Sequence, residues 1–187
     1  MQLLKQNTLE NVKQEIGEII QQLNSTTACF TGHRSQKLPW RFNEDDDRCK
    51  AMKAALFIEI EKAIQRGYKT FLCGMAIGFD MICAETVIEL KKKYADIKII
   101  GVLHCKNQDN KWSHKDKERY RSLLNRLDGI RCIYDEYIGT ECMRERNQYM
   151  VNNSSLMIAL FDGLIGGTKS TIDYARKQGL DIVILEP

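Results

Sequence analysis

Hydrophobic positions along the chain follow a helical spacing first and short continuous runs afterwards. Across residues 8–23 polar residues separate apolar ones at the spacing of an amphipathic helix, namely Leu9, Val12, Ile16, Ile19, Ile20 and Leu23. Short apolar runs follow and predict strands at 27–31, 69–73, 97–103, 130–134, 155–161 and 181–185. Between these runs, helical patterns lie near 49–66, 79–93, 115–127, 143–153 and 169–178.

This alternation of strands and helices predicts an α/β fold. Because the strands are continuously apolar, we expect a Rossmann-like, mostly parallel sheet with helices on both faces, plus the N-terminal helix. Right-handed crossovers place every strand-to-helix loop at one edge of such a sheet, where ligands of these folds bind. No linker-like stretch divides the chain, so we expect a helical extension at 1–26 and one Rossmann domain at 27–187.

Composition narrows the class of protein. The 187 residues are 43% hydrophobic and 28% charged, as in ordinary globular domains, and the formal charge of +3 is modest for a nucleic-acid binder. Neither a signal peptide nor a membrane span of about 20 apolar residues is evident. Scattered cysteines without a CxxC pair predict reduced thiols in the cytoplasm, and we expect no metal and no cofactor. They are Cys29, Cys49, Cys73, Cys83, Cys105, Cys132 and Cys142.

Two loops after predicted strands carry glycines beside polar groups. In the first, Gly32 lets the backbone turn, and His33 and Arg34 suit a phosphate or carboxylate, although a plain surface turn is the alternative. Trp40 further on either lines the same pocket or anchors the loop. The second loop holds Gly74, Gly78 and Asp80 at a helix N-terminus, which favours anions; Asp80 either caps that helix or bonds a ribose-type hydroxyl.

The third loop, residues 104–112, offers Gln108 and Trp112 for recognition of a base by hydrogen bonding and stacking. Trp112 is equally suited to anchoring the helix that follows. The neighbouring His104 and Cys105 are weak candidates for catalysis, because adjacent side chains in an extended chain point to opposite sides.

The fourth region is the richest in candidate chemistry. Gly166, Gly167 and Thr168 end a strand and open a helix, and Thr171 adds a hydroxyl one turn later. Glycines let a turn approach a phosphate, and helix N-terminal amides bind it. The alternative is a capped turn before the last helix.

Three segments resemble the SLOG superfamily. Residues 146–150 (RNQYM), the following strand and residues 166–175 resemble the closing half of the DprA/Smf Rossmann core. Residues 74–80 (GMAIGFD) are similar to that family's Ser-Gly-x-Ala-x-Gly-Ile-Asp segment, and the helix from Met143 to Met150 looks like the Met-x-x-Arg-Lys helix of LOG phosphoribohydrolases. The opening at 31–34 (TGHR) and the Trp112 region are most similar to the YpsA-like branch.

The resemblance implies a sheet that binds nucleotides, nucleotide-derived signals or nucleic acid. LOG-type members hydrolyse N-glycosidic bonds with an Arg, matched by Arg146, and a Glu, whose position holds Thr171. Glu145 or Asp173 would have to replace that carboxylate, so the resemblance favours a nucleotide-type small-molecule binder over an N-glycosidase or nucleotide hydrolase. Single-stranded nucleic-acid binding of the DprA type is a further alternative, and the leading helix together with the superfamily's habits implies a homodimer or higher homo-oligomer.

Overall fold

The computed structural model describes residues 2–187, with side chains from residue 10 onward except at position 11. Six strands occupy the expected runs: β1 (Thr27–Gly32), β2 (Thr70–Cys73), β3 (Lys98–Cys105), β4 (Gly129–Tyr134), β5 (Leu156–Leu160) and β6 (Asp181–Leu185). The helices are α1 (Gln2–Ser25), α2 (Asp47–Gln65), α3 (Phe79–Leu90), α4 (His114–Leu124), α5 (Thr140–Asn152) and α6 (Gly167–Lys177). A short 3-10 turn, η1 (Ser35–Lys37), lies in the loop after β1. The predicted α/β fold is confirmed.

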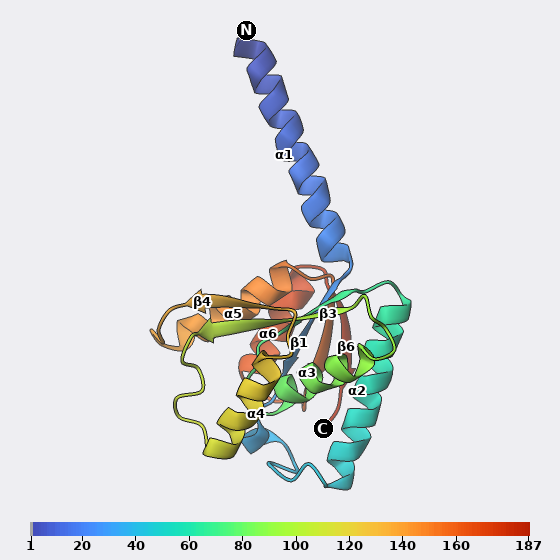
Figure 1. Ribbon diagram of the computed structural model, residues 1–187, viewed down its shortest axis with the longest axis vertical. Helices are drawn as coiled ribbons and strands as arrows, with labels where there is room; N and C mark the ends of the chain where they lie inside the picture. Colours follow the sequence, from blue (N-terminus) through green and yellow to red (C-terminus); the bar gives the residue numbers. More distant parts are fainter. Residues whose placement is uncertain (1) are drawn as a thin grey trace.

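The six strands form one parallel sheet in the order β4-β3-β2-β1-β5-β6 (Figure 1). The chain adds β2, β3 and β4 on one side of β1, then returns to add β5 and β6 on the other. Its direction of winding therefore reverses between β1 and β5. In open α/β sheets the loops that leave two such neighbouring strands diverge, and a crevice for ligands forms between them.

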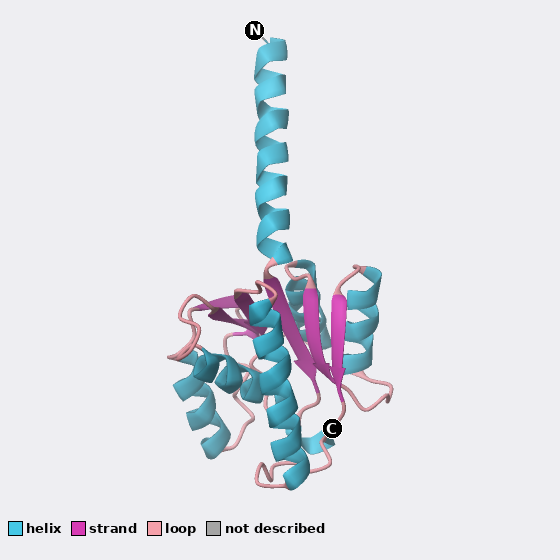
Figure 2. Ribbon diagram, turned by 90° about the vertical axis from the view of Figure 1, so that its right-hand side faces the viewer, coloured by secondary structure: helices cyan, strands magenta, loops and turns pink. Residues whose placement is uncertain are grey.

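Helices cover both faces of the sheet (Figure 2). On one face α2, α3 and α4 pack against a core that includes the stacked rings of Phe30 and Phe71, with centroids 5.9 Å apart. On the other face α5 and α6 pack on a second core that includes Met157 and Ile172. Burial on both faces explains why the strands are continuously apolar.

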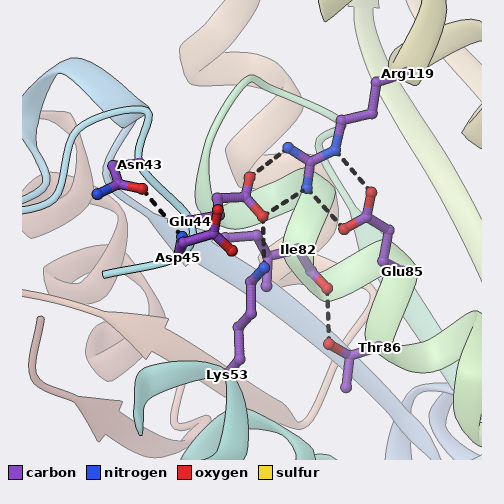
Figure 3. Close-up of polar contacts among 8 residues, drawn as sticks. All are labelled: Asn43, Glu44, Asp45, Lys53, Ile82, Glu85, Thr86 and Arg119. Atoms are coloured by element: carbon purple, nitrogen blue, oxygen red, sulfur yellow. Dashed lines mark hydrogen bonds and ion pairs between the residues drawn. The ribbon is translucent and has the colours of Figure 1, made fainter. Parts of the chain in front are cut away.

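A group of charged side chains ties the long loop after β1 to the helices around it (Figure 3). Arg119 of α4 donates two hydrogen bonds of 2.7 Å to the carboxylate of Glu85 in α3. The same guanidinium also bonds to Glu44 of the loop, which accepts a further bond from Lys53 of α2. The charged group therefore fixes the later part of this loop, at Glu44, to α2 and α4, and through Arg119 to α3.

We expect the Arg119→Met variant to lower the free energy of unfolding by about 1–3 kcal/mol at neutral pH, because it removes charge-assisted hydrogen bonds. Burial raises the pKa of Glu44, but the bonds from Arg119 and Lys53 outweigh it, so the pKa stays below its ordinary value. A carboxyl with a lowered pKa stabilises the fold above its unfolded pKa, and that stability is lost as pH falls through the folded pKa. Urea unfolding of both proteins at pH 7 and below pH 4 should show the difference shrinking in acid.

Arg121→Met is the matched control, since Arg121 lies on the same helix and its nearest carboxylate oxygen, on Asp109, is 3.9 Å away. Equal losses for the two variants at both pH values would contradict a structural role for the charged group.

Candidate functional site

A cleft of about 910 Å³ opens at the carboxyl edge of the sheet, where β1 and β5 are neighbours. Its size lies within the range of small-molecule sites. The loop after β1, the β5–α6 turn and inward-facing residues of α5 and α6 line it. Nine of the residues that we predicted as ligand contacts meet here: Gly32, His33, Arg34, Asp80, Arg146, Gly166, Gly167, Thr168 and Thr171. Four others, Gly74, Gly78, Gln108 and Trp112, are not among the residues that line it.

The N-terminus of α6 forms one wall of the cleft. The helix begins at Gly167, and the residue before it, Gly166, provides no side-chain cap. Backbone N–H groups in the first turn of a helix have no partner within the helix, so an uncapped start leaves them available to an anion. A Cβ atom added to Gly167 would meet no other residue within 4 Å, which shows that the backbone here borders open space. Lys37 brings a cation nearby, with its Nζ atom 3.7 Å from the position of a Cβ on Gly166.

Arg146 of α5 places a buried cation on the cleft wall. Its side chain is only 7% exposed, and its Nε and Nη1 atoms have no hydrogen-bond partner in the part of the chain that the structure describes. Asp80 lies 3.5 Å from Nη1, close enough for an ion pair. Burial lowers the pKa of Arg146, against the attraction of Asp80. The Nη1 atom lies beside Gly74 and Asp80, but Arg146 is one of the residues that line the cleft, and a guanidinium in such a position is suited to bind the oxygens of a phosphate or carboxylate.

Asp80 is buried beside this guanidinium. Burial raises the pKa of its carboxyl, while Arg146 and the backbone N–H of Ala76 act in the opposite direction. That N–H donates to Asp80 Oδ2 at 3.2 Å, within the turn that precedes α3. Asp80 thus holds the turn before α3 and partners Arg146; it does not cap the helix, whose N-cap is Gly78 without a side-chain hydrogen bond.

His33 connects the loop after β1 to the α6 turn. Its Nε2 atom lies 2.9 Å from Oδ1 of Asp162, the second residue after β5, and its Nδ1 atom lies 3.5 Å from the hydroxyl of Thr168. The backbone N–H of Leu164 donates to the same Asp162 carboxylate and holds the pKa of Asp162 below its usual range, with His33 adding to this effect. Loops that are 135 residues apart in sequence are thereby joined at the cleft.

Two predicted glycines serve the site indirectly. A Cβ on Gly74 would fall 1.3 Å from Arg146 Nη1, so only glycine leaves room for the buried guanidinium. Gly78 has a φ of +103°, and a Cβ there would approach the backbone nitrogen of Ser35 to 2.6 Å. Gly78 therefore lets the loops after β1 and β2 pack together, which brings His33 close to the start of α3.

Gln108 and the two tryptophans bond and pack inside the protein. The Gln108 side chain donates to the Met75 carbonyl at 2.9 Å and accepts from the His104 N–H at 3.3 Å, which joins the loops after β2 and β3. Trp112 packs edge-on against Tyr120 of α4, with ring centroids 5.0 Å apart, and Trp40 is buried in the core. These contacts favour the anchoring alternatives for both tryptophans.

The side chains considered for catalysis, Thr171, Glu145 and Asp173, all form hydrogen bonds within the protein. Thr171 donates to the Gly167 carbonyl and accepts from Asn147, both at 2.9 Å. Glu145 accepts from the Tyr134 hydroxyl at 2.6 Å and is not among the residues that line the cleft. Asp173 does line the cleft, but hydrogen bonds from Lys169 and Arg176 hold its carboxylate and lower its pKa.

Several residues of the cleft were missed by sequence reasoning. Lys37 and Lys177 add cations to the lining, and Asn147 orients Thr171; Asp162, which is not among the lining residues, holds His33. A polar residue directly after a predicted strand, as at Asp162, was the one usable signal; Lys177 lies at the far end of its helix and gave none. Among the described residues, no group of three His, Cys, Asp or Glu side chains is arranged to hold a metal ion, and no helix has the length and hydropathy to cross a membrane.

Comparisons with known proteins agree with this picture of the fold. A family model described as the YspA SLOG family matches residues 28–181. An uncharacterised SPbeta prophage-derived protein, YoqJ of Bacillus subtilis, is 33% identical over 141 residues, which cover 69% of this chain and 82% of the relative. A UPF0398 protein of Brevibacillus brevis is 28% identical over 122 residues, 65% of each chain.

Two solved structures of DNA processing protein A share the architecture. The protein from Helicobacter pylori, described for its single-stranded DNA binding mode, matches with a TM-score of 0.59 and 15% identity over 89% of this chain and 67% of that one. The Streptococcus pneumoniae protein also matches with a TM-score of 0.59, at 13% identity, over 87% of this chain and half of that chain. At these identities the likeness concerns the fold alone.

Proposed function

This chain belongs to the YspA SLOG family, and on that premise we propose that it binds a nucleotide or a nucleotide-derived signalling ligand in the cleft between β1 and β5. One observation carries the proposal. Arg146 is almost fully buried and lines the cleft; among the described residues its Nε atom has no hydrogen-bond partner, and its Nη1 atom has only the 3.5 Å ion pair with Asp80. Burying an arginine whose donors are incompletely satisfied is costly, so an anion that contacts the guanidinium from the cleft is the expected occupant.

The anionic part of the ligand would lie between Arg146 and the start of α6. The uncapped first turn, Lys37 and the exposed Arg34 all favour negative charge there. Five residues of the cleft are Lys or Arg and three are Asp or Glu, so the lining has a positive excess without being strongly basic. Such a balance suits a small phosphate ester with a polar sugar better than a long polyanion.

The hydrogen-bonded hydroxyl of Thr171 supports binding of the ligand without LOG-type hydrolysis. Because Thr171 is bonded to Asn147 and to the helix backbone, and has no carboxyl group, it cannot act as a general base near neutral pH. The seven cysteines are all free thiols, six of them buried, which supports the proposal that the protein works in the reducing cytoplasm.

A Gly167→Leu variant tests the proposed site. No protein atom lies within 4 Å of a Cβ at this position, so the fold should tolerate the change, while the new side chain would extend from a residue of the cleft wall into the ligand's space. We expect the affinity for nucleotide probes such as AMP, ADP and ADP-ribose, measured by calorimetry, to fall at least 100-fold, or about 2.7 kcal/mol. The unfolding midpoint should remain close to that of the wild type.

Gly17→Leu is the matched control, since Gly17 lies on α1 and a Cβ there also meets nothing within 4 Å. Unchanged affinity in the Gly167→Leu variant would reject the site. Titration with a short single-stranded oligonucleotide tests the alternative function, nucleic-acid binding. If the protein binds the oligonucleotide but none of the nucleotide probes, and this affinity falls steeply with salt, then single-stranded nucleic-acid binding is favoured over nucleotide binding.

A further inference from the structure

Helix α1 projects away from the rest of the protein (Figures 1 and 2). Its side-chain hydrogen bonds to other elements lie at its C-terminal end, where Asn24 donates to the Asn152 carbonyl and Ser155 donates to the Ser25 carbonyl, both at 3.1 Å. We predicted an amphipathic helix at residues 8–23 that either packs on its own domain or faces a partner subunit. The structure shows a longer helix whose described apolar side chains are not covered by its own domain.

The apolar face of α1 has the spacing of a coiled coil. Val12, Ile16, Ile19 and Leu23 follow one another at intervals of four, three and four residues, and Ile20 lies beside them. In the sequence Leu9 continues the pattern three residues earlier; its side chain lies outside those described. The five described side chains are between 44% and 62% exposed. A helix standing in water gains little from intrinsic propensity, and Gly17 weakens this one further, so burial of the apolar face is needed to stabilise it.

We propose that α1 joins this chain to further copies of itself through a parallel coiled coil. The 3-4 spacing keeps one stripe in contact with a partner helix only where the partner repeats the same spacing, and an identical α1 does so by construction. In heptad terms Ile16 and Leu23 occupy position a, whereas Val12 and Ile19 occupy position d. Isoleucine at both positions, with Ile20 at position e, favours more than two copies.

The charges beside the seam are compatible with a parallel arrangement. Lys13 lies on the e side of the stripe and Glu15 on the g side. In a parallel assembly each g residue faces the e residue five positions later in a neighbouring helix, which places Glu15 beside Ile20, so no like charges meet across the seam. The outer face is polar, with Gln14 hydrogen-bonded to Glu18 and Gln21 exposed.

Sedimentation equilibrium of the full chain tests the proposal. The wild type should sediment at two or more times the chain mass of 21.6 kDa, and Ile16→Lys/Ile19→Lys should sediment as a single chain at the same concentrations. The matched control, Gln14→Lys/Gln21→Lys, adds the same charge to the polar face and should keep the wild-type mass. A wild type of single-chain mass overturns the proposal, and so does an Ile16→Lys/Ile19→Lys variant that stays associated.

A cysteine at position 23 tests the orientation. In a parallel assembly Leu23→Cys side chains of neighbouring copies meet and should form an interchain disulfide under mild oxidation, which the wild type should not form. In an antiparallel pair that aligns residue 23 with residue 12, the two cysteines would lie about 16 Å apart along the axis, too far for a bond. Failure to crosslink in an associated protein would overturn the parallel arrangement. Nucleotide affinity of the dissociated variant is a separate readout, because the cleft contains no residue of α1.

Discussion

Arg146→Met is expected to reduce the free energy of unfolding by about 3 kcal/mol at neutral pH, the largest effect that we predict. Removal of one partner of a buried ion pair leaves the other charge without compensation, and such losses amount to about 3–5 kcal/mol. We expect the lower end because Asp80, whose pKa burial already raises, can take up a proton once Arg146 is gone. Urea unfolding at several pH values provides the measurement.

The sign of the pH effect follows from the direction of that pKa. A carboxyl whose pKa is raised in the folded state stabilises the fold fully below its unfolded pKa, and this stability is lost as pH rises through the folded pKa. The Arg146→Met variant should therefore recover part of its stability as the solution is acidified. If the loss in free energy of unfolding is the same at neutral and acid pH, the destabilisation does not come from an unpaired carboxylate at Asp80.

Combining Asp80→Asn with Arg146→Met separates the effect on stability from the effect on ligand binding. Replacing both members of a buried pair by neutral groups of similar size is often close to neutral for stability, so Arg146→Met/Asp80→Asn should unfold near the wild-type midpoint. It should still bind nucleotide probes at least 100-fold more weakly, because the buried cation is missing. A stable double variant with wild-type affinity would remove Arg146 from the proposed site.

Gly74→Ala is the second large effect. The added Cβ would lie 1.3 Å from Arg146 Nη1 and 2.7 Å from Asp80 Oδ2, so the guanidinium must leave its place. Overpacking of this kind typically costs about 1–3 kcal/mol, and we expect about 2 kcal/mol together with at least a tenfold loss of nucleotide affinity. Thermal unfolding and calorimetry measure the two effects.

Non-additivity identifies the cause of that loss. If the methyl group acts by displacing Arg146, then adding Gly74→Ala to Arg146→Met should cost less than Gly74→Ala does in the wild type, because the guanidinium is gone and only Asp80 Oδ2, at 2.7 Å, still has to shift. Simple addition of the two single losses would show that Gly74→Ala acts on the backbone instead. Gly17→Ala, where a Cβ meets nothing within 4 Å, controls for the change in glycine content.

The periodicity of hydrophobic residues was sufficient for the architecture, because strands buried on both faces must be continuously apolar. Each of the six predicted strands has a counterpart in the structure, and the parallel sheet follows from the helices between them. The turn at Gly166–Thr168 was also recognisable, since glycines between an apolar run and a helical pattern mark a turn. The full length of α1 could not be predicted from the sequence, because its first residues lack an apolar repeat.

Residues of the cleft were predictable only where they follow a strand or belong to a family motif. His33 and Arg34 directly follow β1 and do line the cleft, whereas Gln108 and Trp112 occupy an equivalent loop after β3 and do not. Both loops lie at the same edge of the sheet, and local sequence does not distinguish them. The strand order does: β1 is next to β5 at the point where the winding reverses, while two strands, β2 and β1, separate β3 from β5.

By itself, the sequence determined the fold class, the glycine turn at the start of α6 and the amphipathic character of α1, because each is encoded in spacing along the chain. Tertiary structure decided which loops share a cleft, that Gly74 makes room for Arg146, and that the apolar side of α1 is uncovered. Those features depend on atoms brought together from distant parts of the chain by the order of the strands. No local pattern specifies that order, since the free energy that selects it comes from packing the whole sheet between its two layers of helices.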